Sequence, residues 1–280
     1  MTLVDAHQHY WNSARGDYGW MPADDPVLTR LYGPADLAPF LKDTGVAHTV
    51  IVQAAESVEE TEYMLGIADA TPNVAGVVGW IDFEDHAHLR QLERLARHPK
   101  FKGVRPMVQD IPDVDWMLRD DVQWGYQALI DLDLTFDALG FPQHLDNFLT
   151  VFERYPQMRA VVDHCMKPQI GAHSEESFAH WATGMERIAR ETGAFCKLSG
   201  IVTETGENWT VDELEPYAHH VLEVFGPDRV MWGSDWPVMR LRGEYGDWHA
   251  AAQKLTSHLS KADKAHVFGK TAVAFYDLAL

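Results

Sequence analysis

The chain has 280 residues, of which 46% are hydrophobic, and its formal net charge at pH 7 is −19. That length allows one large domain or two small ones, and the lack of any block of lysines or arginines excludes nucleic acid and anionic membranes as expected partners. The apolar runs are shorter than the roughly 18–20 residues of a membrane span, and no basic, apolar leader opens the chain, so we expect a cytoplasmic protein that acts on a small molecule.

Eight short apolar runs of strand length recur along the chain. Most are continuous and rich in valine, isoleucine and phenylalanine, which is typical of strands that are covered on both faces. The runs cover residues 3–7, 48–54, 74–82, 101–106, 134–139, 159–164, 194–199 and 229–235.

Helical segments separate these runs, and several carry start signals. Ser57 and Thr210 each stand three residues before a glutamate, which is the spacing of a capping box. Pro34 suits a first helical turn and Asp85 can cap the helix that follows it. Further helices are expected over residues 115–131, 142–155, 174–192, 245–257 and 261–277.

This alternation predicts the fold class. Eight strands that are each followed by a helix are typical of an α/β protein with a (β/α)8 TIM barrel, here a single domain over residues 1–280. A doubly wound open sheet is the alternative, but no glycine-rich phosphate loop follows the first strand to support it.

One loop is unusually long. Residues 10–33 separate the first strand from the first helix, and loops longer than about 20 residues are uncommon unless they are functional. The loop contains Trp11 and Trp20, and aromatic faces suit the C–H faces of sugar rings, although packing under the loop is the alternative. We expect this aromatic-rich loop to cover the substrate.

The strand ends carry polar residues of the kinds that active sites use. A barrel enzyme builds its site from the carboxyl-terminal ends of its strands. His7 and His9 end the first run, and residues two apart on a strand point to the same side, so both rings can face the barrel interior. The other strand ends offer Gln53, Asp82, Arg105, Asp137, His164, Ser199 and Asp235.

The His-x-His spacing alone is weak evidence for a metal site. A chain with 15 histidines contains about one such pair by chance. A second pair, His86 and His88, falls at a helix start, where residues two apart do not share a face, and we interpret both as surface histidines. For His7 and His9 the alternatives are metal ligation and a hydrogen-bonded pair without metal.

Residues from later strands could complete a metal site. His164 and Asp235 would add imidazole and carboxylate ligands, giving a mixed nitrogen and oxygen site of the kind that zinc accepts. The two cysteines, Cys165 and Cys196, lie in apolar runs and are expected to be buried free thiols.

Five stretches, in order from the first strand to the last, resemble the amidohydrolase superfamily. More narrowly, they are similar to its sugar-lactone hydrolase branch, so the resemblance implies a (β/α)8 barrel that hydrolyses a carboxylic ester bond in an aldonolactone such as L-fucono- or L-rhamnono-lactone. The stretches are VDAHQHYW (4–11), VIVQA (50–54), KGVRP (102–106), VVDHCMKP (161–168) and VMWGSDWPV (230–238).

This chain differs from the superfamily pattern at positions that hold metal ions in other members. Binuclear members place a carbamylated lysine or a glutamate after the fourth strand and histidines after the fifth and sixth. Here the fourth strand ends in Arg105 and the fifth offers Asp137, so only His164 of that set is present. The alternatives are one zinc, or another divalent ion, and no metal at all; no organic cofactor is expected. The implied metal ligands are His7, His9, His164 and Asp235.

The expected catalytic residues are Asp235, His164 and Arg105. The superfamily uses the aspartate after the eighth strand as general base, so Asp235 is expected to take the proton of the attacking water. Arg105 is a fixed cation suited to an oxygen that gains negative charge, and an ion pair with Asp82 or Asp137 is the alternative. Substrate contacts are expected from Trp11, Trp20, Gln53, Lys167 and Trp236, with a loop anchor as the alternative for Lys167.

Two other functions remain as alternatives to a sugar lactonase. One is a hydrolase of a muconolactone or pyrone lactone, and the other is a metal-dependent decarboxylase of the same superfamily. A decarboxylase would need basic groups to hold a substrate carboxylate, and only Arg105 and Lys167 are obvious candidates. No exposed apolar stripe stands out that would indicate an oligomer interface.

Overall fold

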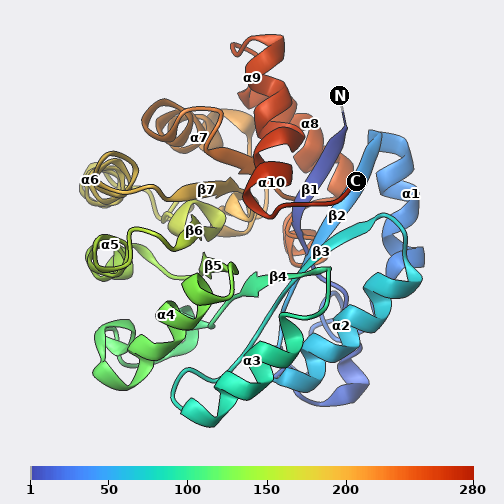
Figure 1. The fold of residues 1–280 in the computed structure, drawn as a ribbon. Coiled ribbons are helices and arrows are strands. Elements are labelled where there is room, and N and C mark those ends of the chain that lie inside the picture. Colours follow the sequence, from blue (N-terminus) through green and yellow to red (C-terminus); the bar gives the residue numbers. More distant parts are fainter. Residues whose placement is uncertain (1) are drawn as a thin grey trace.

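Eight parallel strands form one sheet in which each strand pairs with the next along the chain. The computed structural model describes residues 2–280, and Figure 1 shows the strands at the centre with the helices around them. A parallel bridge between Gln8 and Trp236 links the first strand to the segment after the eighth. The predicted TIM-barrel fold is therefore confirmed. The strands are β1 (Leu3–Gln8), β2 (Val46–Val52), β3 (Val74–Gly79), β4 (Phe101–Val104), β5 (Thr135–Ala138), β6 (Arg159–Val162), β7 (Phe195–Leu198) and β8 (Val230–Trp232).

The helices begin where the sequence signals predict. Ser57 accepts a hydrogen bond from the backbone N–H of Glu60, and Thr210 does the same for Glu213, while Pro34 is the first residue of its helix. The helices are α1 (Pro34–Thr44), α2 (Val58–Ala70), α3 (Leu89–Leu95), α4 (Gln123–Asp131), α5 (Leu145–Arg154), α6 (Glu175–Glu191), α7 (Val211–Phe225), α8 (Tyr245–Leu255), α9 (Lys261–Ala265) and α10 (Thr271–Phe275).

Two helix predictions are too long. In 115–131 the α-helix begins only at Gln123, because Asp113 accepts from the backbone N–H of Asp115 and opens a turn instead. The closing helix of 261–277 is divided by a π-helical segment at His266–Lys270. A Cβ on Gly269 would lie 2.2 Å from the carbonyl oxygen of Thr2, so the helix fits this close against the chain before β1 only with a glycine there.

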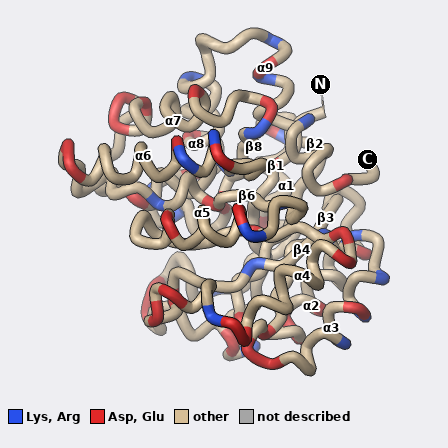
Figure 2. The backbone as a smooth tube through the Cα atoms, turned by 60° about the vertical axis from the view of Figure 1, so that its left-hand side comes forward, with Lys and Arg blue, Asp and Glu red and all other residues tan. Residues whose placement is uncertain are grey.

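The outer surface is acidic. Figure 2 shows Asp and Glu spread over the outer helices and loops, with Lys and Arg lying between them. No helix within residues 2–280 is both long and apolar enough to cross a membrane.

The loop after β2 is held by a buried carboxyl group. Glu60 on α2 is fully buried and its carboxyl oxygens accept hydrogen bonds from the backbone N–H groups of Ala54 (3.0 and 3.1 Å) and Ala55 (3.0 Å). Burial raises the pKa of Glu60 to about 8. The loop that carries Ala54 is therefore tied to α2 by a group that titrates near neutral pH.

We predict that Glu60 makes the fold less stable as the pH rises. The pKa of Glu60 in the folded protein lies above the unfolded value of 4.5. Its contribution to the stability of the fold is therefore complete below about pH 4.5 and is lost as the pH rises through about 8. From pH 6 to pH 9 the free energy of unfolding of the wild type should fall by about 2 kcal/mol more than that of the Glu60→Gln variant. Urea unfolding at both pH values measures this, and the exposed neighbour Glu59→Gln is the control. Identical pH slopes for wild type and Glu60→Gln would contradict the prediction.

Candidate active site

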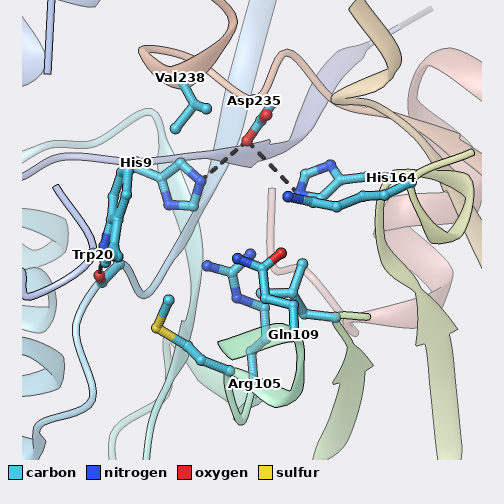
Figure 3. Close-up of a pocket in the computed structure, with 11 residues that line it drawn as sticks. His9, Trp20, Arg105, Gln109, His164, Asp235 and Val238 are labelled. Carbon is cyan, nitrogen blue, oxygen red and sulfur yellow. Dashed lines mark hydrogen bonds and ion pairs between the residues drawn. The ribbon is translucent and has the colours of Figure 1, made fainter. Parts of the chain in front are cut away.

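A small cavity lies at the carboxyl-terminal ends of the strands. It has a volume of about 130 Å³, which is below the roughly 300–1,000 Å³ typical of pockets for drug-sized ligands. Figure 3 shows His9 and His164 on either side of Asp235, with Arg105 facing them across the cavity. The cavity is lined by His9, Trp20, Ala54, Arg105, Met107, Gln109, Leu139, His164, Lys167, Asp235 and Val238.

His7 and His9 are brought together by the end of β1. Their Nε2 atoms are 3.2 Å apart, and both side chains are buried. The Nδ1 atom of His9 is 2.7 Å from the carbonyl oxygen of Val52 at the end of β2, which fixes the ring plane. Burial lowers the pKa of both histidines, so both are neutral at pH 7.

Asp235 lies at the centre of the histidine cluster. It follows β8 at a φ of 58°, and its Oδ1 atom is 3.2 Å from Nε2 of His9, 3.7 Å from Nε2 of His7 and 3.8 Å from Nε2 of His164. Burial alone would raise the pKa of Asp235, but the interactions with His164 and His9 outweigh it and lower the pKa below its usual value. Asp235 is therefore a carboxylate at neutral pH, in the state that can accept a proton.

The side chain of His164 points into the cavity because the chain makes a left-handed turn after β6. It is not on β6, as predicted, but follows that strand in a turn where His164 to Lys167 all have positive φ values. Its Nδ1 atom is 2.9 Å from the hydroxyl oxygen of Ser199, which leaves Nε2 toward Asp235. Burial lowers the pKa of His164 to about 4. Four consecutive left-handed residues without glycine are costly, and such strain is concentrated at functional sites.

We predict that Gly200 is needed to keep His164 in place. Gly200 has a φ of 64°, and a Cβ there would lie 2.3 Å from Nδ1 of His164. The Gly200→Ala variant should lose about 1–2 kcal/mol of unfolding free energy from the left-handed backbone and at least about tenfold in kcat from displacement of the ring. Steady-state kinetics and thermal unfolding measure both effects. Gly193→Ala, where the added methyl meets no atom within 4 Å, is the control; an unaltered kcat in Gly200→Ala would show that this contact is unimportant.

Arg105 reaches the cavity from the end of β4. Its guanidinium NH1 lies 3.4 Å from Asp163 Oδ2, and NH2 donates to the backbone carbonyl of Gln53. The ion pair is therefore with Asp163, and not with Asp82 or Asp137 as the alternative interpretation supposed. Within residues 2–280 the Nε atom of Arg105 is buried and has no hydrogen-bond partner, while NH1 also lies 3.3 Å from Nε2 of His7.

Three of the five predicted substrate contacts do not line the cavity. Trp11 is buried under the loop and donates to the carbonyl oxygens of Leu28 and Arg30. Gln53 donates instead to the backbone carbonyl of Arg105, and the ring of Trp236 packs against Tyr32. The reason is common to all three: the side chain packs behind the cavity wall.

Trp20 and Lys167 do line the cavity, and their contact with a substrate stays a prediction. Trp20 is held there by a 2.6 Å hydrogen bond from its indole N–H to the carbonyl oxygen of Ala54, and Trp11 packs edge-on behind it. Lys167 also lies 3.9 Å from Glu204, so it is a loop anchor as well as a lining residue. The loop of residues 10–33 thus contributes one aromatic wall, and it contains only a short 3-10 turn at Ser13–Arg15 and a bridge between Trp11 and Tyr32.

Sequence reasoning missed several lining residues and one buried charge. Met107 and Gln109 lie in the loop directly after β4, and Val238 follows Asp235 after β8. Lys197 on β7 is fully buried and contacts His7. A lysine within the apolar run of residues 194–199 is a signal that could have found it.

The donor atoms fit one metal ion by distance. His7, His9 and Asp235 each offer one atom, and these atoms all lie within 4.8 Å of one another. A second group of His7, Asp163 and His164 meets the same limit but shares His7 with the first. Neutral imidazole nitrogens and a carboxylate oxygen are ligands that zinc accepts. The set therefore suits a single zinc ion.

The fold and the site together define a (β/α)8 enzyme whose chemistry is carried by histidine and carboxylate groups from different strands. The chain belongs to the amidohydrolase family, whose model matches residues 4–278. An L-fucono-1,5-lactonase of Burkholderia ambifaria is 41% identical over 277 residues, which are 98% of this chain and 94% of the relative. A second L-fucono-1,5-lactonase, of Burkholderia multivorans, is 32% identical over 288 residues, 98% of this chain and 96% of the relative.

A solved structure extends the comparison to the whole fold. The crystal structure of an amidohydrolase from Burkholderia multivorans with bound zinc has a TM-score of 0.93 and 30% sequence identity, with both chains covered completely. The resemblance noted in the sequence is therefore confirmed at the level of the family.

Proposed function

We propose that the protein hydrolyses a sugar-acid lactone of the aldonolactone type to the free acid. The observation that carries the proposal is the buried carboxylate of Asp235, held between His9 and His164 and facing Arg105 across a small cavity. A base and a cation on opposite sides of one cavity suit ester hydrolysis, in which a water loses a proton and a carbonyl oxygen gains negative charge. The two relatives named L-fucono-1,5-lactonase, which this chain matches over nearly its whole length, support the same class of substrate.

In the proposed reaction Asp235 removes a proton from water as the water attacks the lactone carbonyl carbon. The carbonyl oxygen gains negative charge and accepts a hydrogen bond from the guanidinium of Arg105. The ring C–O bond then breaks, and the proton held by Asp235 passes to the leaving ring oxygen, which becomes the hydroxyl of the acid. His164, with Nε2 3.8 Å from the same carboxylate oxygen, is placed to assist this proton transfer.

A zinc ion held by His7, His9 and Asp235 would polarise the carbonyl and lower the pKa of a bound water. The proposal needs no organic cofactor. We propose a cytoplasmic location, because the two cysteines are buried free thiols, which is usual in a reducing compartment.

The cavity walls suit a sugar lactone better than a dicarboxylate. Apolar side chains and an indole form one part of the wall and can contact ring C–H groups, while the amide of Gln109 can bond a hydroxyl group. Only two cationic side chains, Arg105 and Lys167, are among the lining residues, and Lys167 is already near Glu204. The apolar contacts come from Trp20, Ala54, Met107, Leu139 and Val238.

A substrate panel tests the proposed function. Aldono-1,4- and 1,5-lactones of different stereochemistry are assayed by proton release with a pH indicator, beside a pyrone dicarboxylate and aromatic acids. We expect acid release from at least one sugar lactone with kcat/KM of about 10⁴ M⁻¹s⁻¹ or more, as is usual for enzymes on their own substrates. Acid release from the pyrone alone, or CO₂ release from an aromatic acid, would replace the proposal with one of the other functions.

A further inference from the structure

A capping motif at the start of α2 bonds a loop as well as its own helix. In the complete box at the start of α7, the Glu213 carboxylate accepts from the backbone N–H of Thr210 at 2.7 Å. At α2 Ser57 accepts from the N–H of Glu60 at 3.1 Å, as the motif requires. The carboxyl group of Glu60, however, accepts from two consecutive backbone N–H groups of the loop after β2. Each of these N–H groups belongs to a peptide group that also bonds a residue of the cavity.

The first peptide group joins Glu60 to Arg105. The N–H of Ala54 donates to both carboxyl oxygens of Glu60, at 3.0 and 3.1 Å. On the same peptide group, the carbonyl oxygen of Gln53 accepts from NH2 of Arg105. The side-chain amide of Gln53 donates in turn to the backbone carbonyl of Arg105. The guanidinium of Arg105 is therefore bonded to the peptide group that Glu60 holds.

The second peptide group joins Glu60 to Trp20. The N–H of Ala55 donates to Glu60 Oε2 at 3.0 Å. On the same peptide group, the carbonyl oxygen of Ala54 accepts from the indole N–H of Trp20 at 2.6 Å. Hydrogen bonds in such a chain polarise and strengthen one another. The orientation of the indole therefore depends on the same carboxyl group.

We infer that Glu60 is a positioning residue that orients both the cation and the aromatic wall of the site through these two peptide groups. Arg105, Trp20 and Ala54 all line the cavity, and Figure 3 shows Trp20 on the same side of it as His9. Glu60 itself is fully buried on α2. It acts on a substrate through Arg105 and Trp20.

The long loop has a separate attachment to the same helical turn. The hydroxyl of Ser57 donates to Asp17 Oδ2 at 3.0 Å, three residues before Trp20. Arg15 donates to the same carboxylate oxygen at 2.7 Å. The backbone near Trp20 is therefore held through Ser57, while its indole ring is oriented through Glu60. A conservative substitution of Glu60 should turn the ring without releasing the loop.

The Glu60→Gln variant tests the inference with little change in volume. Whichever way the glutamine amide turns, its NH2 group faces the N–H of Ala54, at 3.0 or 3.1 Å, so a donor meets a donor. Both peptide groups must then shift. In ¹H–¹⁵N spectra of the protein without substrate, we expect the indole N–H signal of Trp20 to move to lower proton frequency, because its hydrogen bond weakens. The guanidinium signals of Arg105 should move as well, and Trp20→Phe and Arg105→Met assign the two sets of signals by their loss.

Kinetics distinguish positioning from a general loss of structure. In Glu60→Gln, kcat for the best lactone should fall at least about fivefold through Arg105, and KM should rise at least about threefold through Trp20. In a Trp20→Phe background the same substitution should change KM less than about twofold and still lower kcat. In an Arg105→Met background it should change kcat less than about twofold and still raise KM.

The other capping box provides a matched control. Glu213→Gln makes the same change at the same position of a box, on an exposed residue at the start of α7. It should leave kcat, KM and the signals of Trp20 and Arg105 unchanged. Equal effects of Glu60→Gln in all three backgrounds would overturn the inference, because a loss that does not pass through Trp20 or Arg105 is only structural.

The spectra without substrate separate this inference from the proposed function, on which only its kinetic part rests. Unchanged signals of Trp20 and Arg105 in folded Glu60→Gln would overturn the positioning role even if a sugar lactone is hydrolysed. Shifted signals in a protein that hydrolyses no sugar lactone would support the positioning role, and the proposed function would then fail alone.

Discussion

Replacement of Asp235 by asparagine is expected to lower kcat by about 10³-fold or more, with the fold retained, because it removes the group that accepts the proton of the attacking water. The asparagine amide has nearly the same shape and can still contact His9, which lies 3.2 Å from Oδ1. It has no carboxylate and cannot act as a base. The substitution therefore tests proton transfer with little change in packing.

The measurement is steady-state hydrolysis of the best lactone over a range of pH, with circular dichroism to verify the fold. Asp228→Asn, an exposed carboxylate shortly before β8, is the control and should keep wild-type kcat. A kcat for Asp235→Asn within tenfold of the wild type would show that another group, or the solvent, supplies the base. In that event His164 would be the next candidate, since its Nε2 atom faces the same part of the cavity.

The order of strands and the strand-end residues could be predicted because they depend on local patterns. Continuous apolar runs separated by capped helices are recognisable in the sequence, and a barrel places the ends of its strands at one face. Asp235 and His9 could therefore be placed at one site from chain order alone. The prediction needed no knowledge of side-chain rotamers.

The direction of each side chain could not be predicted in the same way. The observed β6 ends at Val162, and His164 reaches the cavity through a left-handed turn that no propensity indicates. Gln53 and Trp236 also follow strand ends, yet packing turns their side chains away from the cavity. Whether a strand-end residue lines the cavity depends on contacts between strands far apart in the sequence.

The ion-pair partner of Arg105 could not be predicted from the sequence either. Sequence reasoning offered Asp82 and Asp137 as partners because both stand at strand ends. Asp137 is instead held by Lys197 and by the hydroxyl of Tyr276, while Asp82 is only half-buried and accepts from a backbone N–H in its own loop. The pairing of Arg105 with Asp163 follows from the barrel geometry and from Lys197 on β7, which pairs with Asp137.

Replacement of Arg105 by methionine should lower kcat by about 10²–10³-fold, the usual cost of removing a donor to an oxygen that gains charge in the transition state. If Arg105 acts on the developing oxyanion, kcat should fall more than KM rises; an effect on KM alone would mean that it binds only the ground state. Arg105→Lys should remain impaired, because a lysine keeps the charge but cannot hold the carbonyl of Gln53, the carboxylate of Asp163 and the substrate with one planar group. Arg94→Met on the exposed face of α3 is the control. The Arg105 variants should remain folded, because Asp163 keeps Lys197 as a partner at 2.9 Å.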